Sequence, residues 1–570
     1  MLARAPSDAA REDDARAPAR NRYRLWAVAA LSLTVGFAAW AAGAGFVAFW
    51  AFAVSSTAVA LALPLPYAFV SPLYMGVAGW FVDMFPLLIL VGWTAVVLRW
   101  MWGLLRDRRL PRAGWWMWLA AGLVAWTALG VVVVSFEDIR HFLLLFGIQF
   151  VISGLLVAVA DALPTREDRI KVASALVAYV GLLSAAVFLQ WIGVPVQDLQ
   201  DDSISDRLEA AYGVDAFPNN TGMIKYTRAK EAGAGQLRRK LKALDARGAE
   251  VPPFMVFRPR LQAFTNRLVV RFEGSARHLE RALGARDVEL IYDNVGLAPM
   301  DTVPRLRSFP RNALTYAGIC AAAFPFALYL AWTAAGRRRW LGRAGVAACL
   351  FGAAFSIARG AWVAILLGIL YLIVDGVVSR RRKVAAIAIY AAAALITTIV
   401  FFVRYDSDPI TARALGESSV ATREELYTDT LESVTGVNLL LGYGTELPRT
   451  EKGTTRVYGD FGRYVPPAGT HSTYLNYLFR TGVPGLAAIV ALYVVAWLVA
   501  RRAARGSGDD RALATLSAVA VVIAAAHATI LSLYVEPAYA LAITLVLGLA
   551  LAASHGGAVR PRGGSAGAEA

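Results

Sequence analysis

The feature that most constrains this chain is a succession of continuous apolar runs, each about 17–25 residues long. A helix of that length crosses the hydrocarbon core of a membrane. Backbone inside lipid must form helices or closed barrels, and these runs are unbroken rather than alternating. Apolar residues make up 58% of the chain, whereas soluble domains contain about 45–50%. The sequence therefore predicts an all-α polytopic membrane protein.

About fourteen runs qualify as spans on length and hydropathy. They lie near residues 24–41, 43–62, 64–80, 86–104, 114–135, 139–161, 171–193, 313–333, 342–357, 361–378, 384–403, 472–500, 512–533 and 536–554. The run at 64–80 is the weakest because it contains Pro64, Pro66 and Pro72. It is retained for parity. With Met1 in the cytoplasm, the basic loop after residue 104 is cytoplasmic only if three spans precede the run at 86–104.

The formal net charge of +16 is distributed in a way that argues against a nucleic-acid partner. Much of it lies in short loops between apolar runs, where an excess of Lys and Arg marks the cytoplasmic side. The four loops contain Arg106, Arg108, Arg109 and Arg112; Arg337, Arg338, Arg339 and Arg343; Arg380, Arg381, Arg382 and Lys383; and Arg501, Arg502 and Arg505. This pattern predicts that both termini are cytoplasmic.

The spans and polar segments divide the chain into seven parts. They are a disordered cytoplasmic tail (1–23), an N-terminal transmembrane bundle (24–193), an extracytoplasmic insert (194–312), central transmembrane helices (313–403), an extracytoplasmic loop (404–471), C-terminal transmembrane helices (472–554) and a disordered tail (555–570). In the insert, strands at Leu268–Phe272 and Val288–Tyr292 around a helix at Ser275–Leu283 predict a small α/β module. Cys320 and Cys349 lie within apolar runs and are expected to be free thiols.

The predicted topology places several ionisable side chains at the same outer membrane face. Arg305 and Arg307 precede the run at 313–333, Arg359 lies in the turn between 342–357 and 361–378, and His471 precedes the run at 472–500. An arginine at the membrane interface is costly unless it is paired, and pyrophosphate is a ligand that arginine binds bidentately. A salt bridge or a lipid phosphate would satisfy Arg359 equally well.

The residues around these side chains resemble the O-antigen ligase and O-antigen polymerase family of bacterial membrane glycosyltransferases. One motif of that family is His-(Asn/Ser/Gln)-x9-Gly-x-x-Gly. It is resembled here by His471-Ser472, followed after nine residues by Gly482 and after two more by Gly485. Ser356 to Val363 resembles its Ser-x-x-Arg-Gly-x-Trp segment, with Val363 where leucine is frequent. Arg423 to Gly444 resembles the helix and Gly-x-Gly turn before the histidine. Arg305 to Asn312 resembles the lead into the middle helix less closely.

The resemblance implies a GT-C-like membrane glycosyltransferase in the bacterial cytoplasmic membrane, with its site on the periplasmic or extracellular side. The donor would be a glycan on undecaprenyl pyrophosphate, and the acceptor a hydroxyl of a glycan, a lipid A core or a protein. His471 would be the base and Arg359 would stabilise the departing pyrophosphate. Substrate-binding roles fall to Arg305, Arg307, Arg423 and Ser472. Neither a metal nor another cofactor is expected.

Several alternatives stay open. Asp83 is a second conceivable base, and His527 is expected to make a structural hydrogen bond within a late span. Within the family, the motifs separate ligase, polymerase and protein O-oligosaccharyltransferase poorly. From another class, a transporter or flippase of a lipid-linked or anionic substrate is the rival. Such proteins often contain internal repeats and charged or broken helices at the midplane, whereas here the candidate ionisable residues gather at one outer face and no repeat is evident.

Overall fold

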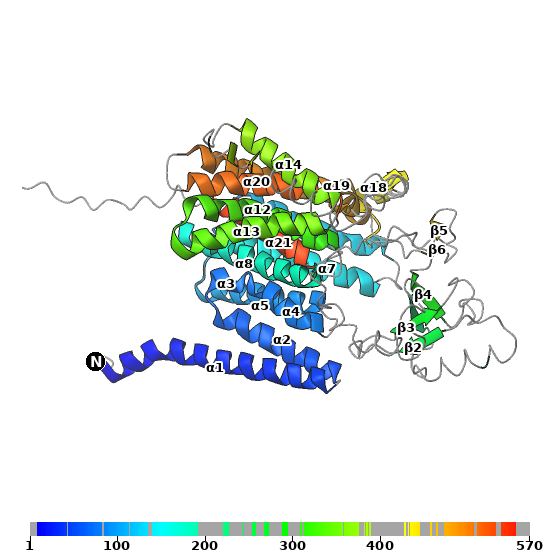
Figure 1. Ribbon diagram of the computed structural model, residues 1–570, viewed down its shortest axis with the longest axis horizontal. Helices are drawn as coiled ribbons and strands as arrows, with labels where there is room; N and C mark the ends of the chain where they lie inside the picture. The colour runs from blue at the N-terminus through cyan, green and yellow to red at the C-terminus, as the bar shows by residue number, and fades with distance from the viewer. Residues whose placement is uncertain are drawn as a thin grey trace, which may run out of the picture.

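The computed structural model is a bundle of long helices with a small β-sheet beyond one end (Figure 1). It describes residues 8–42, 44–81, 85–112, 114–134, 139–191, 221–226, 243, 254–257, 267–272, 288–293, 308–309, 313–356, 358–375, 381, 384–385, 387–388, 427–428, 431–432, 434–444, 457–458, 463–464, 472–506, 510–531 and 537–553. Within these residues the protein is mostly helical, as the apolar runs predict.

Seven described helical segments are long and apolar enough to cross a membrane: Asn21–Ala41, Leu87–Arg106, Trp116–Val133, Leu145–Ala162, Arg166–Leu189, Leu314–Thr333 and Thr473–Arg505. Four shorter apolar segments are Phe46–Ala62, Gly360–Val374, Arg511–His527 and Pro537–Ala552. The protein is therefore a multi-pass membrane protein. The figure of fourteen spans remains a prediction, because most of the run at 384–403 lies outside the described residues.

The helices follow the order of the apolar runs. Their bounds are α1 (Asp8–Ala41), α2 (Gly45–Ala62), α3 (Leu65–Ala68), α4 (Ser71–Phe81), α5 (Phe85–Arg106), α6 (Trp116–Leu129) with the 3₁₀ turn η1 (Gly130–Val133), α7 (Ile139–Ala162), α8 (Arg166–Trp191), α12 (Ala313–Thr333), α13 (Gly336–Phe355), α14 (Arg359–Val374), α18 (Asn438–Leu441), α19 (Thr473–Arg505), α20 (Arg511–His527) and α21 (Pro537–Ala552).

Two predictions near the N-terminus differ from the structure. The run at 64–80 is not one spanning helix but the short α3 and the eleven-residue α4. Prolines explain the break, since they begin helices readily and interrupt them elsewhere: Pro64 caps α3 and Pro72 lies in the first turn of α4. The helix α1 also begins at Asp8, within the range that the sequence predicts as a tail.

The core of the bundle lies around α12 and α21. Every residue of α21 is buried, and 89% of the α12 span is buried against α8, α13, α14, α20 and α21. By contrast, α1 packs beside α2 at the edge, with only 11% of its span buried (Figure 1). Such exposed apolar helices suit contact with lipid. Cys320 and Cys349 are buried free thiols, as predicted.

Four strands of the insert form one antiparallel sheet: β1 (Thr221–Tyr226), β2 (Phe254–Phe257), β3 (Arg267–Phe272) and β4 (Val288–Asp293), in the order β2-β3-β1-β4. The strands β3 and β4 coincide with the two that the sequence predicts, but β1 lies between them. That arrangement is typical of a split β-α-β unit. The predicted helix at Ser275–Leu283 lies outside the described residues, so the α/β character of the insert remains a prediction. A separate hairpin pairs β5 (Val457–Tyr458) with β6 (Arg463–Tyr464).

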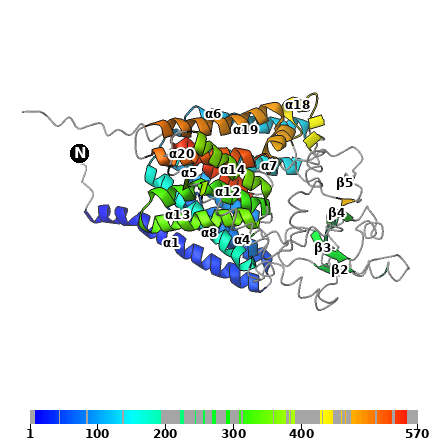
Figure 2. The same cartoon turned by 45° about the horizontal axis from the view of Figure 1, so that its top comes forward.

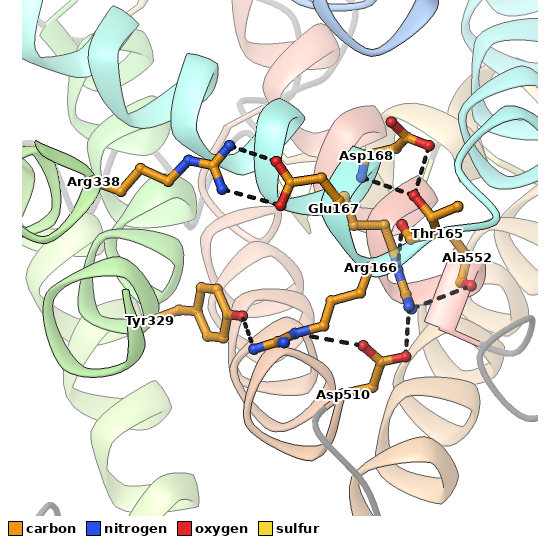
Figure 3. Close-up of polar contacts among 9 residues, drawn as sticks. Thr165, Arg166, Glu167, Asp168, Tyr329, Arg338, Asp510 and Ala552 are labelled. Atoms are coloured by element: carbon orange, nitrogen blue, oxygen red, sulfur yellow. Dashed lines mark hydrogen bonds and ion pairs between the residues drawn. The ribbon is translucent and has the colours of Figure 1, made fainter. Parts of the chain in front are cut away.

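Charged side chains tie the helices together at one end of the bundle, which we call the basic end (Figure 3). Asp510, just before α20, accepts a hydrogen bond of 2.8 Å from the buried Arg169 on α8. The neighbouring Glu167 pairs with Arg338 on α13. On α7, Asp161 accepts two hydrogen bonds from Arg109 in the loop between α5 and α6. These contacts place the predicted cytoplasmic loops side by side at this end.

Candidate functional site

At the end opposite the basic end, a turn of four residues, Ala528–Leu531, follows α20. The last carbonyl groups of a helix lack partners within the helix and need donors from elsewhere. Here the donors come from distant parts of the chain. The backbone N–H of Thr473 donates to the carbonyl of Ala528 at 2.8 Å, and the Thr473 hydroxyl donates to that of Leu531 at 2.6 Å. The start of α19 is thereby fixed to the end of α20.

The same turn contacts the segment that contains Arg359. Arg359 is the first residue of α14 and Gly360 is the second. Gly360 lies so close to the side chain of Ile530 that a Cβ atom at Gly360 would overlap it. The turn before α14 is closed by the indole of Trp362, which donates to the carbonyl of Ala353 at 2.6 Å. The Arg-Gly-x-Trp segment therefore holds the backbone of Arg359 next to the Ala528–Leu531 turn.

The loop before α19 reaches this turn as well. The hydroxyl of Tyr427 donates to the carbonyl of Thr529 at 3.1 Å. Tyr427 lies four residues after Arg423, in the segment whose sequence resembles the helix before the family histidine. Three motif segments that are far apart in sequence thus meet at one turn of four residues. We call this meeting point the convergence turn.

Ser472 begins α19 as its N-cap. Its backbone is extended, with φ −135° and ψ 128°, and its side chain accepts a hydrogen bond from the N–H of Leu475 at 3.4 Å. Serine is among the residues preferred at this position because it satisfies an orphan N–H. Ser472 is also buried, with 3% exposure. The structure thus gives Ser472 a capping role, and its contact with substrate stays a prediction.

The Gly-x-x-Gly motif divides α19 into a short helix, Thr473–Thr481, and a long one. Gly482 has φ 67° and ψ −170°, which only glycine adopts without strain. The carbonyl of Thr481 accepts a hydrogen bond from the indole of Trp126 on α6 at 2.9 Å. Gly485 approaches the Thr481 side chain so closely that a Cβ would overlap it. The motif therefore redirects the chain between the short helix and the span.

The Gly-x-Gly turn after α18 packs against this bend, and Figure 2 shows α18 beside the first part of α19. The N–H groups of Tyr443 and Gly444 donate to the carbonyls of Phe479 and Arg480 at 2.8 and 3.0 Å. Gly442 has φ 68° and abuts the backbone of Arg480. Reciprocally, Gly482 abuts the carbonyl of Leu440. We call this pair of turns the glycine interlock.

Four of the predicted site residues lie outside the described residues: His471, Arg305, Arg307 and Arg423. The alternative base Asp83 lies outside them too, and so does the side chain of Arg359. Their neighbours are placed. Ser308, next to Arg307, is buried and donates to the carbonyl of Leu183 on α8 at 2.8 Å. His527 is buried at the end of α20, and its Nδ1 lies 2.9 Å from the hydroxyl of Tyr539, which confirms the predicted structural hydrogen bond.

Sequence reasoning missed the convergence turn and the contact of Ile530 with Gly360. No charged residue or motif marks residues 528–531 in the sequence.

Metal binding was not expected, and within the described part of the chain no group of three or more His, Cys, Asp or Glu side chains is arranged to hold an ion.

The bundle of apolar helices defines a multi-pass membrane protein. The convergence turn marks its candidate site at one end of the bundle. Residues 344–490 match the family model described as O-antigen ligase. The matched stretch includes the Arg359-Gly360 segment, the glycine interlock and His471-Ser472. The chain is therefore similar to that family over these residues, which confirms the resemblance seen in the motifs. No curated protein matches the chain. This match and the membrane helices support a role in surface polysaccharide biosynthesis.

Proposed function

We propose that the protein transfers or polymerises an oligosaccharide carried on undecaprenyl pyrophosphate, at the outer face of the cytoplasmic membrane. The observation that carries this proposal is the meeting of three motif segments at the convergence turn, within and beside the stretch that matches the O-antigen ligase family. The positive-inside pattern supports an extracytoplasmic location, because the basic loops lie at the opposite end of the bundle.

The proposed reaction needs one base and a set of cations. An acceptor hydroxyl attacks the anomeric carbon of the donor glycan, the bond from that carbon to the pyrophosphate oxygen breaks, and a glycosidic bond forms. His471 accepts the hydroxyl proton, a role typically worth about 10²–10⁴-fold in rate. Arg359, with Arg305 or Arg307, stabilises the negative charge on the departing polyprenyl pyrophosphate. Arg423 and Ser472 are proposed to bind the substrate, and no metal is needed.

A knockout of the source organism, complemented with wild type or His471→Ala, tests this proposal. Envelope glycans are separated on a gel and blotted for the polymer. For a polymerase, the ladder of chain lengths collapses to a single repeat on an intact anchor. For a ligase, full-length polymer stays on undecaprenyl pyrophosphate and the acceptor stays bare. An unchanged profile with the His471→Ala protein present in the membrane would contradict the proposal and favour a transporter.

A further inference from the structure

His527 is the last residue of α20, and the convergence turn follows it directly. Its backbone carbonyl accepts a hydrogen bond from the N–H of Ile530 at 3.1 Å, so the turn closes on His527. The side chain is buried, with 1% exposure. Whatever fixes His527 therefore also fixes where the turn begins.

The imidazole of His527 is held between two helices of the bundle core. Its Nδ1 lies 2.9 Å from the hydroxyl of Tyr539 on α21, a hydrogen bond that can form with either tautomer of the ring. Gly318 on α12 leaves the space that this pair occupies. A Cβ atom at Gly318 would lie 2.6 Å from Cε1 of His527 and 2.7 Å from the ring of Tyr539. The end of α20 is thereby placed against both α12 and α21.

Stability alone does not explain this pair. Nε2 of His527 is buried and has no hydrogen-bond partner among the described residues. An unpaired buried polar atom costs about 1–3 kcal/mol, whereas two apolar side chains of the same shape can be neutral or stabilising. The pair supplies direction instead, since a hydrogen bond requires a narrow range of distance and angle. Natural proteins break such local rules mainly at functional sites.

Two routes lead from the convergence turn to the proposed site. Ile530 abuts Gly360, the residue after Arg359. The turn also accepts two hydrogen bonds from Thr473, which lies two residues after His471. A displacement of the turn therefore moves the backbone next to the proposed base and the backbone of the proposed cation.

We infer that His527 and Tyr539 are positioning residues for glycan transfer, an inference that rests on the proposed function. The hydrogen bond between them sets the place of the convergence turn, and the turn sets the distance between His471 and Arg359. Neither His527 nor Tyr539 touches the substrate. This role goes beyond a structural hydrogen bond, because it determines the turnover of protein that is folded.

The test measures turnover and donor binding separately, for the full-length protein in nanodiscs with a purified lipid-linked glycan donor and its acceptor. Tyr539→Phe removes only the hydroxyl of the pair. The kcat per folded molecule is expected to fall about 10- to 100-fold, because a misplacement of about 1 Å can cost 100-fold in rate. The dissociation constant of the donor is expected to change far less, because only the relative placement of base and cation shifts.

The matched control is Tyr74→Phe. It removes a hydrogen bond between α4 and α8, which the Tyr74 hydroxyl donates to the carbonyl of Ala175 at 2.7 Å. This bond also joins two helices but does not involve the convergence turn. Tyr74→Phe is therefore expected to keep the wild-type kcat per folded molecule.

A second pair of variants tests the other partner of the hydrogen bond. Asparagine carries a polar δ atom bonded to Cγ, as histidine carries Nδ1, and leucine is about the size of asparagine but apolar. His527→Asn is expected to keep most of the wild-type kcat, and His527→Leu to lose as much as Tyr539→Phe. A role in stability alone would change the melting temperatures without separating the kcat values per folded molecule.

Wild-type kcat in folded Tyr539→Phe, or equal kcat in His527→Asn and His527→Leu, would overturn the inference. So would a Tyr74→Phe protein that loses as much turnover as Tyr539→Phe. If Tyr539→Phe does not fold, the comparison of the two His527 variants decides. Wild-type protein that transfers no glycan would instead contradict the proposed function, and this inference with it.

Discussion

At the scale of single residues, Thr473 is the side chain that joins two helices at the convergence turn. Its hydroxyl reaches the carbonyl of Leu531, and its N–H reaches that of Ala528. Ser472 caps the same helix. The residue before them is His471, so a small shift in this cap moves the proposed base relative to the donor. Misplacement of reacting groups by about 1 Å can cost 100-fold in rate.

We therefore predict that Thr473→Val lowers both stability and transfer activity. The substitution keeps the shape but leaves the carbonyl of Leu531 without this donor, at a cost of about 1–3 kcal/mol. Thermal unfolding in detergent and the rate of glycan transfer measure the two effects. The matched control is Thr515→Val near the start of α20, where the lost hydrogen bond is to Arg511 within the same helix. A control that loses as much activity as Thr473→Val would contradict the assignment.

At the scale of elements, the glycine interlock explains why glycines stand at fixed places in two motifs. Gly442 and Gly482 both have positive φ. Gly442 abuts the backbone of Arg480, and Gly482 abuts the backbone of Leu440. A side chain at either position would separate the loop from the short helix. The two motifs are thus one structural unit, although residues 443–481 lie between these glycines in the sequence.

We predict that Gly482→Ala abolishes most transfer activity. The backbone conformation at this position costs a non-glycine residue about 1–3 kcal/mol, and the added Cβ meets the carbonyl of Leu440. Gly122→Ala on α6 is the control, because a Cβ there meets nothing within 4 Å. Transfer rate and melting temperature are measured for both. Wild-type activity in Gly482→Ala would show that the bend is dispensable.

The sequence predicted the helices and the motif residues, but not how the motifs meet. Long apolar runs and basic loops are strong local signals, so α5, α7, α8 and α12 lie close to their predicted ranges. The weak span at 64–80 was indicated by its prolines, Pro64, Pro66 and Pro72. In the structure this run is divided into two short helices. The convergence turn could not be predicted, because its contacts use backbone carbonyls and the apolar Ile530. Such contacts depend on helix packing and have no residue signature.

At the scale of the whole molecule, an extracytoplasmic site requires that the basic end and the glycine interlock lie on opposite sides of the membrane. Arg108 lies in the basic loop after α5, and Val437 is exposed just before α18. The two natural cysteines are fully buried and give little background in labelling.

We predict that Val437→Cys is labelled by a membrane-impermeant maleimide applied from the extracytoplasmic side of sealed cells or spheroplasts. We predict that Arg108→Cys is labelled only after the membrane is permeabilised. The reason is the positive-inside rule, which keeps Arg-rich loops in the cytoplasm. Wild-type protein is the control and should stay unlabelled in both conditions. Equal labelling of both variants on one side would contradict the topology and, with it, the extracytoplasmic site.

We propose that this protein transfers a glycan from polyprenyl pyrophosphate with His471 as the base. The most direct measurement is glycan transfer from a purified lipid-linked donor by the full-length protein, with His471→Ala compared against wild type and against His555→Ala near the C-terminus. We predict that His471→Ala loses about 100-fold or more in rate and binds the donor as tightly as wild type, whereas His555→Ala transfers at the wild-type rate. Equal transfer rates for wild type and His471→Ala would contradict the assignment of His471 as the base.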